Sequence, residues 1–347
     1  MLNVPIIVDK PYAYGQPGWR GQLRATAEDF QVREELDFTL DGAGEHAWLW
    51  VRKRDANTEW VAKQLAKQAG VAPGAVSYAG LKDRHAVTEQ WFSVHLPGRA
   101  EPDWSTDDAA DFQVLKAVRH SRKLRRGALS GNTFRIAIRH LDGDPAELAA
   151  RLHLISTHGA PNYFGEQRFG HDGGNLARAE AMFNGQAKVR DRHQRGLYLS
   201  AARSELFNAV LAQRVQDQSW NRALPGEVLM LAGSHSIFAA PELDDALRQR
   251  VETFDVHPTG PLWGSGELRS GGAVRDLEET VAATFPIFRD GLAAAGLQQE
   301  RRALRLLIAE AALEFPEPRL AILSFRLPAG AYATTVLREL VQTDEPA

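Results

Sequence analysis

The sequence predicts an α+β protein in which one domain, built from both ends of the chain, is interrupted by an inserted, helix-rich domain. Strand-like alternation of apolar and polar residues is concentrated near the two ends, whereas helical spacing dominates the middle. The chain has 347 residues, which is long for one domain and comfortable for two. We therefore expect residues 1–157 and 301–347 to form the first domain and residues 158–300 to form the insert.

The N-terminal part is predicted to consist mainly of strands. Phe30 and Val32 alternate with polar residues, which is the period of a strand. Asn57 or Thr58 caps a helix that Gly70 ends. Strands are expected over residues 28–35, 47–53, 88–96, 112–118 and 133–138.

The middle of the chain changes character near residue 158. Asp144-Pro145 begins a helix just before this point, because Pro is favoured at the first helical position. Residues 158–174 form a Gly-rich, aromatic loop, and Pro316-Glu-Pro318 later separates two apolar runs, as in a hairpin. Those runs cover residues 303–315 and 319–327, helical patterns cover residues 175–183, 200–216, 242–251, 274–284 and 332–341, and a Gly- and Pro-rich segment covers 256–266.

The composition excludes several classes of protein. The chain has no cysteine, so it can form neither a disulfide framework nor a thiolate metal site. Residues 1–9 lack the basic region of a signal peptide, and no apolar run approaches the ~18 residues of a membrane span. We expect a soluble, cytoplasmic protein.

The charge distribution is more informative than the net charge of −3. Residues 112–141 contain no Asp or Glu but many Lys and Arg, and residues 188–203 form a second basic cluster. Such basic segments on a weakly acidic protein are typical of phosphate contacts. The alternative, that these residues only form solvated faces, is equally compatible with the pattern.

The stretch Gly80-Leu-Lys-Asp-Arg-His-Ala-Val-Thr-Glu-Gln-Trp-Phe-Ser93 is the strongest candidate for a site. Gly80 marks a turn before a predicted strand, so Asp83 lies where a rigid sheet can aim a side chain. Lys82 and Arg84 favour the ionised carboxylate. The alternative is a solvated charged turn.

Metal and nucleotide motifs are weak or missing. There is no H-E-x-x-H sequence, and the histidines are scattered. Gly264-Ser-Gly266 lacks the third glycine of a dinucleotide-binding loop. We therefore expect no metal site.

The order of residues from Gly80 to Gln90 resembles the catalytic motif of the TruD family of tRNA pseudouridine synthases. Five further stretches, spread over both predicted domains, resemble motifs of the same family. They are Glu28-Asp-Phe30-x-Val-x-Glu34, Gly131-Asn-x-Phe134, Asn162-Tyr-Phe-Gly-x-Gln-Arg-Phe-Gly170, Arg203-Ser-x-Leu-Phe-Asn208 and Pro328-Ala-Gly330-x-Tyr-Ala-Thr-x-x-x-Arg-Glu339. One departure is Tyr332, where Phe is the more frequent residue of the family.

The resemblance implies a fold and an activity. The fold is a pseudouridine synthase-type mixed, mainly antiparallel sheet with flanking helices, plus an inserted helix-rich α/β domain. The activity is the isomerisation of uridine to pseudouridine at position 13, in the D arm of tRNA, with no cofactor. It implies tRNA as the partner, no protein partner, and a monomer.

The resemblance also implies roles for individual residues. Asp83 matches the catalytic aspartate, which either attacks C1′ of the ribose or removes the proton from C2′. Arg24 matches a basic position that approaches this aspartate. Phe30, Asn132, Phe134 and Tyr332 match residues that frame the flipped uracil. Candidate RNA-binding residues are Lys82, Arg84, Arg122, Lys123, Arg125, Arg126 and Arg168.

Two other functions remain open from the residues alone. A non-catalytic RNA-binding protein or chaperone would use the same basic surfaces and would give Asp83 no special role. A hydrolase of small molecules with an aspartate nucleophile would need a dry pocket and no basic surface.

Overall fold

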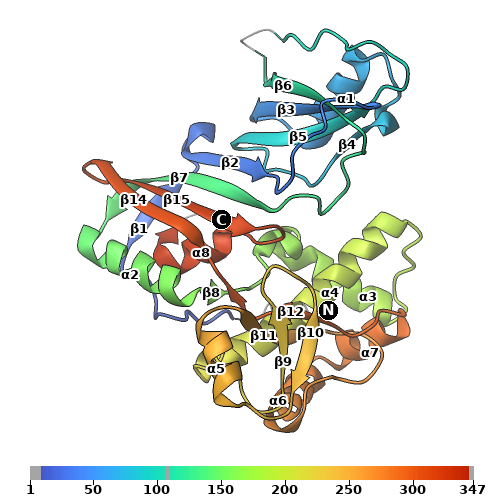
Figure 1. Cartoon of the computed structure of the whole chain (residues 1–347). Coiled ribbons are helices and arrows are strands. Elements are labelled where there is room, and N and C mark those ends of the chain that lie inside the picture. Colours follow the sequence, from blue (N-terminus) through green and yellow to red (C-terminus); the bar gives the residue numbers. More distant parts are fainter. Residues whose placement is uncertain (1–8, 107–109, 344–347) are drawn as a thin grey trace.

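The computed structural model describes residues 9–106 and 110–343. This part of the chain forms an upper part around a large sheet and a lower part around a smaller sheet and several helices (Figure 1). Strands from both ends of the chain meet in the large sheet, where β2 and β15 flank β7. The α+β class and the mainly antiparallel sheet are therefore confirmed.

The large sheet has ten strands within the described residues, along the path β14-β15-β7-β2-β5-β3-β6. In addition, β1 pairs with β7, β4 with β5, and β16 with β1. The β2–β5 and β1–β16 pairs are parallel. The strands are β1 (Arg20–Leu23), β2 (Phe30–Glu35), β3 (His46–Arg54), β4 (Val76–Tyr78), β5 (Val87–His95), β6 (Phe112–His120), β7 (Gly131–Asp142), β14 (Ala309–Glu317), β15 (Leu320–Pro328) and β16 (Gln342–Thr343).

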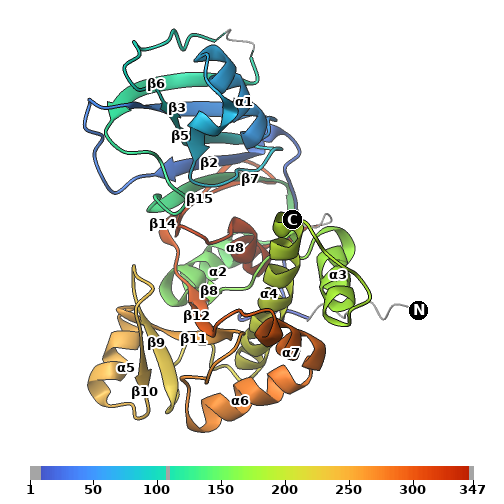
Figure 2. The same ribbon diagram turned by 90° about the vertical axis from the view of Figure 1, so that its right-hand side faces the viewer.

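Three helices pack on one face of this sheet. They are α1 (Thr58–Gln68), α2 (Pro145–His158) and α8 (Ala333–Leu340). The predicted caps are confirmed, because the Asn57 side chain accepts from the backbone of α1 and Asp144 accepts from that of α2. Apolar residues of α1 cover β3 and β5, whereas those of α2 and α8 cover β7 and β15 (Figure 2).

The register of the strands shows that α1, α2 and α8 lie on the same face of the large sheet. Thr88 of β5 lies opposite Val32 of β2, and Val32 lies opposite Phe134 of β7. Residues directly opposite in neighbouring strands point to the same side of a sheet. The row of side chains on β2 and β7 therefore lies between the area covered by α1 and the area covered by α8.

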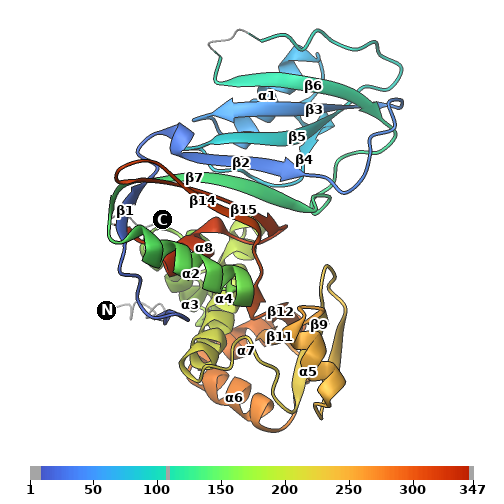
Figure 3. The same cartoon turned by 60° about the vertical axis from the view of Figure 1, so that its left-hand side comes forward.

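The segment expected to form the insert begins and ends at a two-stranded ribbon. β8 (Ala160–Pro161) pairs with β13 (Arg305–Leu306), so the chain leaves and returns at one place. β12 (Glu300–Ala303) pairs with β11 and so still belongs to the second sheet. The order of this sheet is β10-β9-β11-β12. Figure 3 shows β9, β11 and β12 below the large sheet. The other elements of this segment are α3 (Gly174–Phe183), α4 (Arg192–Gln216), β9 (Glu227–Leu231), β10 (Ile237–Ala240), α5 (Asp245–Glu252), β11 (Val256–Leu262), α6 (Gly272–Ala283) and α7 (Pro286–Ala294).

The predicted start of the long helix at Ser200 was wrong. α4 starts at Arg192, because the Asp191 side chain accepts a hydrogen bond from Gln194 N at 2.7 Å and caps the helix there. The first turns are exposed and contain Gly196, so they carry no apolar periodicity that could have revealed them.

The Gly- and Pro-rich segment over residues 256–266 contains a strand, β11 (Val256–Leu262), that its composition did not reveal. This strand pairs with both β9 and β12. A Cβ atom at Gly260 would lie 2.9 Å from Leu304 and 3.1 Å from the ring of Phe207 on α4. The glycine thus allows the strand to pack closely against the helix, which is a tertiary requirement rather than a turn signal.

The predicted C-terminal hairpin is confirmed, but its first strand is shorter than expected. The run predicted over residues 303–315 is divided among β12, β13 and β14, and β14 continues to Glu317. The turn contains Arg319, whose φ is 67°. Pro316 therefore lies in the strand rather than in the turn.

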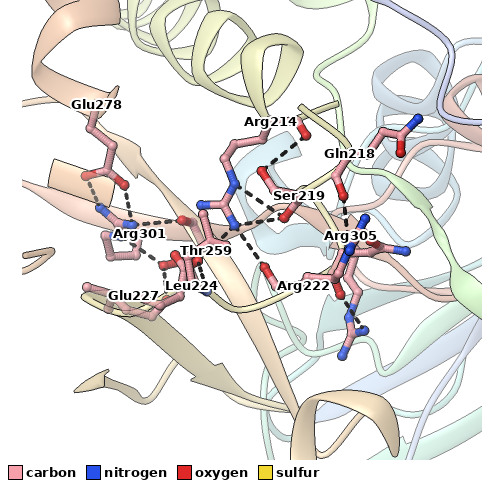
Figure 4. A network of polar contacts seen from close by, with 12 residues as sticks. Arg214, Gln218, Ser219, Arg222, Leu224, Glu227, Thr259, Glu278, Arg301 and Arg305 are labelled. Carbon is pink, nitrogen blue, oxygen red and sulfur yellow. Dashed lines mark hydrogen bonds and ion pairs between the residues drawn. The ribbon is translucent and has the colours of Figure 1, made fainter. Parts of the chain in front are cut away.

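Buried ion pairs hold the second sheet to its helices. Arg214 of α4 pairs with Glu227 of β9 at 2.8 Å, and Arg301 of β12 pairs with Glu278 of α6 at 2.7 Å. Figure 4 shows these side chains around Thr259, which also accepts from Arg301. Removing one partner would leave a buried, uncompensated charge, which typically costs roughly 3–5 kcal/mol.

Acid should destabilise the insert through His257. Its Nδ1 accepts a hydrogen bond from Arg305 Nε at 2.9 Å, and burial, together with Arg305, lowers the pKa of this imidazole from 6.5 to about 4. Because the unfolded state then binds the proton more tightly, the free energy of unfolding falls as pH decreases from about 6.5 to about 4. His257→Gln, which can still accept from Arg305, should lose less stability over this range. Urea unfolding of both proteins at pH 7 and pH 4.5 checks this, and an identical pH dependence would contradict it.

Candidate active site

Asp83 lies in the loop between β4 and β5. Its Oδ2 accepts a hydrogen bond from Arg24 Nη2 at 3.2 Å, although the two residues are far apart in sequence. The Asp83 side chain is 37% exposed, so a substrate can reach the carboxylate. The structure thus brings together the two residues expected to act in catalysis.

The backbone around Asp83 is held by buried polar groups. Lys82 Nζ pairs with Glu34 Oε1 at 2.6 Å, and Lys82 N donates to Thr58 Oγ1 at 3.1 Å. Lys53 Nζ donates to the carbonyl oxygen of Asp83 at 2.7 Å. These contacts fix the loop from both sides of the carboxylate, as a preorganised catalytic group requires.

Burial shifts the pKa values of two of these supporting groups, Glu34 and Lys53. Burial raises the pKa of Glu34, and Lys82 opposes that change. Burial lowers the pKa of Lys53 to about 8, and Asp83 opposes it. Lys82 has only 9% of its side chain exposed, and its ammonium group is engaged in the internal ion pair with Glu34.

Arg24 adopts an unusual backbone conformation next to Asp83. Its φ is 56°, in the left-handed region that costs a non-glycine residue roughly 1–3 kcal/mol. The guanidinium lies over the ring of Phe30, 4.2 Å from its centroid, in a cation–π contact. The following turn is anchored by the ion pair between Asp29 and Arg139 at 2.9 Å. These neighbours compensate for the strain and direct the guanidinium at Asp83.

Phe30, Asn132 and Phe134 lie in the row of side chains between α1 and α8. The rings of Phe30 and Phe134 meet edge to face at 6.3 Å, and Phe134 stacks on Phe325 at 5.4 Å. Phe30 and Phe134 are 2% and 6% exposed, so neither ring presents an open face in this structure. Asn132 lies opposite Glu34, and its buried Oδ1 has no hydrogen-bond partner within the described residues.

Tyr332 and Arg168 form a separate pair. Arg168 Nη2 donates to the Tyr332 hydroxyl at 2.6 Å and joins the insert to the residue that precedes α8. Among the residues that the structure describes, no hydrogen bond or ring contact joins this pair directly to Asp83.

The basic loop between β6 and β7 is anchored by one apolar side chain. Leu124 is buried against Trp48 and Ala79, and Trp48 Nε1 donates to the carbonyl oxygen of Arg122 at 2.8 Å. Ala79 precedes the loop of Asp83, so the basic loop is packed beside the start of the candidate site. Arg84, Arg122, Lys123, Arg125 and Arg126 are all exposed.

Glu34 and Lys53 were missed as site residues. Both were visible as charges within an apolar strand pattern: Glu34 continues the alternation of Phe30 and Val32, and Lys53 that of Leu49 and Val51. A charge on the buried side of a strand implies a buried partner. That signal identifies such residues but not their partners.

One cavity of the described structure lies away from the predicted site residues. This cavity of about 510 Å³ lies between the end of α2, the segment after α4 and α5, and none of the predicted site residues lines it. Within residues 9–106 and 110–343, no three His, Asp or Glu side chains form a group that could hold a metal ion. No helix in those ranges is both long and apolar enough to cross a membrane.

Comparisons with known proteins give matches that cover nearly the whole chain. The family model of tRNA pseudouridine synthase D (TruD) matches residues 8–185 and 173–340. The chain is 54% identical to tRNA pseudouridine synthase D of Nitrosococcus oceani, over 93% of this chain and 91% of the relative. It is 49% identical to the protein of that name from Methylococcus capsulatus, over 99% and 97%.

A crystal structure has the same fold. It is that of a Methanosarcina mazei protein described as a tRNA pseudouridine synthase D, and it superposes with a TM-score of 0.74 over 95% of both chains. The sequence identity is 23%, so this likeness concerns the fold.

Proposed function

Since the chain belongs to the tRNA pseudouridine synthase D (TruD) family and isomerises uridine in tRNA, we propose that Asp83 is the carboxylate that acts on the ribose of uridine 13. The observation that carries this proposal is the contact between Asp83 and Arg24 on a loop held by Lys53 and Lys82. An exposed carboxylate on a fixed backbone can meet a bound ribose without reorganising.

The reaction needs only this carboxylate and a way to hold the base. The bond between N1 of uracil and C1′ breaks, the base turns, and a bond between C5 and C1′ forms. C5 loses its proton and N1 gains one, so no cofactor, oxidant or energy source is consumed. Asp83 starts the reaction by attacking C1′ or by removing the proton from C2′, and its geometry serves both routes.

Phe30, Asn132, Phe134 and Tyr332 frame the uracil in this proposal. Asn132 is the strongest of the four, because its buried Oδ1 has no hydrogen-bond partner in the described part of the chain and can accept from the N3–H of uracil. Phe30 acts mainly through Arg24, whose guanidinium it supports. Phe134 lies next to Phe30 and packs under the uracil, and Tyr332 contacts the uracil from the side of α8.

The exposed basic residues bind phosphates of the tRNA in this proposal, together with Arg168. Arg125→Ala combined with Arg126→Ala should weaken tRNA binding and reduce the slope of log affinity against log salt by about one per lost contact. Fluorescence titrations at several salt concentrations measure both quantities. The control is Arg275→Ala with Arg289→Ala, which makes the same charge change at exposed arginines already paired with carboxylates. Equal slopes for the two double variants would remove the basic loop from the RNA interface.

Two further points extend the proposal. The protein acts as a monomer in the cytoplasm, where its tRNA substrate is found. The insert is a separate folding unit, since it has its own apolar core and its own sheet, and it closes on the RNA from the side opposite the large sheet.

The test is direct detection of the product. The protein is incubated with an unmodified tRNA transcript in buffer containing a chelator, and pseudouridine is mapped by chemical derivatisation and primer extension. We expect a single new pseudouridine at position 13. RNA binding without any pseudouridine would instead support a non-catalytic RNA-binding protein.

A further inference from the structure

Two arginines of the insert meet next to Tyr332. Arg168 Nη2 donates to the Tyr332 hydroxyl at 2.6 Å, and Arg168 Nη1 donates to Ser200 Oγ at 3.1 Å. The guanidinium of Arg302 lies 4.2 Å from the ring centroid of Phe164, and that of Arg168 lies 5.4 Å from the same centroid. Both cations therefore gather around one aromatic ring beside a residue proposed to contact the base.

Neither guanidinium forms an ion pair with a carboxylate of residues 9–106 or 110–343. Arg302 Nη2 donates to Asn162 Oδ1 at 2.6 Å, and the acceptors of Arg168 are hydroxyls, so every acceptor is uncharged. The Nε atoms of both arginines are buried without a hydrogen-bond partner in the part of the chain that the structure describes. The pKa of Arg302 is lowered to about 10, mainly by burial; Tyr332 opposes this shift and the charge of Arg168 contributes to it. Two neighbouring, partly buried cations are unfavourable unless an anion joins them.

The cluster is rigid. The Asn208 side chain accepts from Phe164 N at 2.9 Å and donates to Phe164 O at 3.1 Å, which fixes the loop that leads to Arg168. A Cβ atom at Gly165 would lie 3.3 Å from Thr334 Oγ1, so this loop packs closely against α8. The positions of Arg168 and Tyr332 are therefore set relative to each other before any ligand binds.

We propose that Arg168 and Arg302 bind a backbone phosphate of the tRNA beside the target uridine, and that the Tyr332 hydroxyl orients Arg168 for this contact. The inference rests on the proposed function, which places the uracil against Tyr332. A phosphate suits the pair, because the planar N–H groups of arginine match phosphate oxygens in pairs. A phenylalanine at position 332 would contact a base but could not orient the arginine.

The test removes the charge from the RNA and from the protein, separately and together. RNA fragments of the D arm carry one neutral methylphosphonate at each position flanking uridine 13, and binding is measured in an Asp83→Asn background. Arg168→Gln and Arg302→Gln should each weaken binding by about tenfold and lower the salt slope by about one. Neutralising the contacted phosphate should weaken binding to the parent protein by a similar factor, but should weaken binding to the two arginine variants no further.

Tyr332→Phe tests the orienting role. It should weaken binding less than Arg168→Gln does, and it should add nothing when combined with Arg168→Gln. Arg275→Gln is the matched control, because this exposed arginine of α6 already pairs with Glu279. Helix α6 lies at the end of the lower part that is away from the large sheet (Figure 1). The control should leave affinity and salt slope unchanged.

Several outcomes would overturn the inference. The first is that each methylphosphonate weakens binding to both arginine variants as much as it weakens binding to the parent protein. The second is that the arginine variants keep the salt slope of the parent protein. The third is that the effects of Tyr332→Phe and Arg168→Gln on affinity simply add in the double variant. If Arg302→Gln does not fold, binding of the methylphosphonate series to the parent protein and to Arg168→Gln still tests the inference. Failure of the proposed function would appear separately, as an absence of pseudouridine after incubation of unaltered protein with unmodified tRNA.

Discussion

Asp83→Asn should reduce formation of pseudouridine below detection while leaving tRNA binding intact or slightly tighter. Asparagine keeps the size and hydrogen-bonding capacity of the side chain, but it has neither the negative charge nor the basicity that action on the ribose requires. No other carboxylate in the Gly80–Ser93 stretch can replace it, since Glu89 lies on the following strand and pairs with Arg52 at 2.8 Å. Rapid-quench assays with excess enzyme measure turnover, and filter binding of the same transcript measures affinity.

The matched control for this experiment is Asp55→Asn. Asp55 is an exposed carboxylate near the same loop, and its φ of 49° suits asparagine as well as aspartate. It should retain turnover, because surface changes usually stay within about half a kcal/mol. Substantial turnover by Asp83→Asn would show that this carboxylate is not the catalytic group.

Arg24→Met should lower the single-turnover rate by about 100-fold with a much smaller change in tRNA affinity. Methionine keeps the length of the side chain and its contact with Phe30, but it cannot hold the Asp83 carboxylate in place. Displacing a reacting group by about 1 Å typically costs a factor of this size. Arg24→Lys keeps the charge but loses the planar guanidinium. Its single-turnover rate should therefore lie between those of the parent protein and Arg24→Met.

Thermal unfolding separates this effect from misfolding. Methionine has the same backbone strain as arginine at position 24, so the melting temperature should change little. A loss confined to tRNA affinity, with a normal rate at saturating RNA, would identify Arg24 as a phosphate contact instead of a partner of Asp83.

Much of the fold and the candidate for the site could be predicted from local patterns. Alternation identified strands such as β2 and β3, and cap residues located the starts of α1 and α2. The Gly80–Ser93 stretch identified the family, because its many consecutive residues give a specific match, and it supplied the candidate for the site. These features depend on neighbours within a few residues, so they are visible in the chain itself.

Helix starts and strands that depend on packing were missed. α4 begins within an exposed, glycine-containing segment, and β11 consists largely of residues that favour turns. Both elements form because the rest of the insert packs against them, with Gly260 allowing the close contact to Phe207. Local propensity is a weak guide where tertiary contacts decide.

The partners of the charged residues were decided only by the tertiary structure. Lys82 and Arg84 were equivalent neighbours of Asp83 in the sequence, yet Lys82 turns inward to Glu34 and Arg84 remains exposed. Arg168 reaches Tyr332 across 164 positions in the sequence. Such pairs arise from strand register and from the docking of the insert on α8, because these bring distant segments together and determine which charge is buried and which can meet RNA.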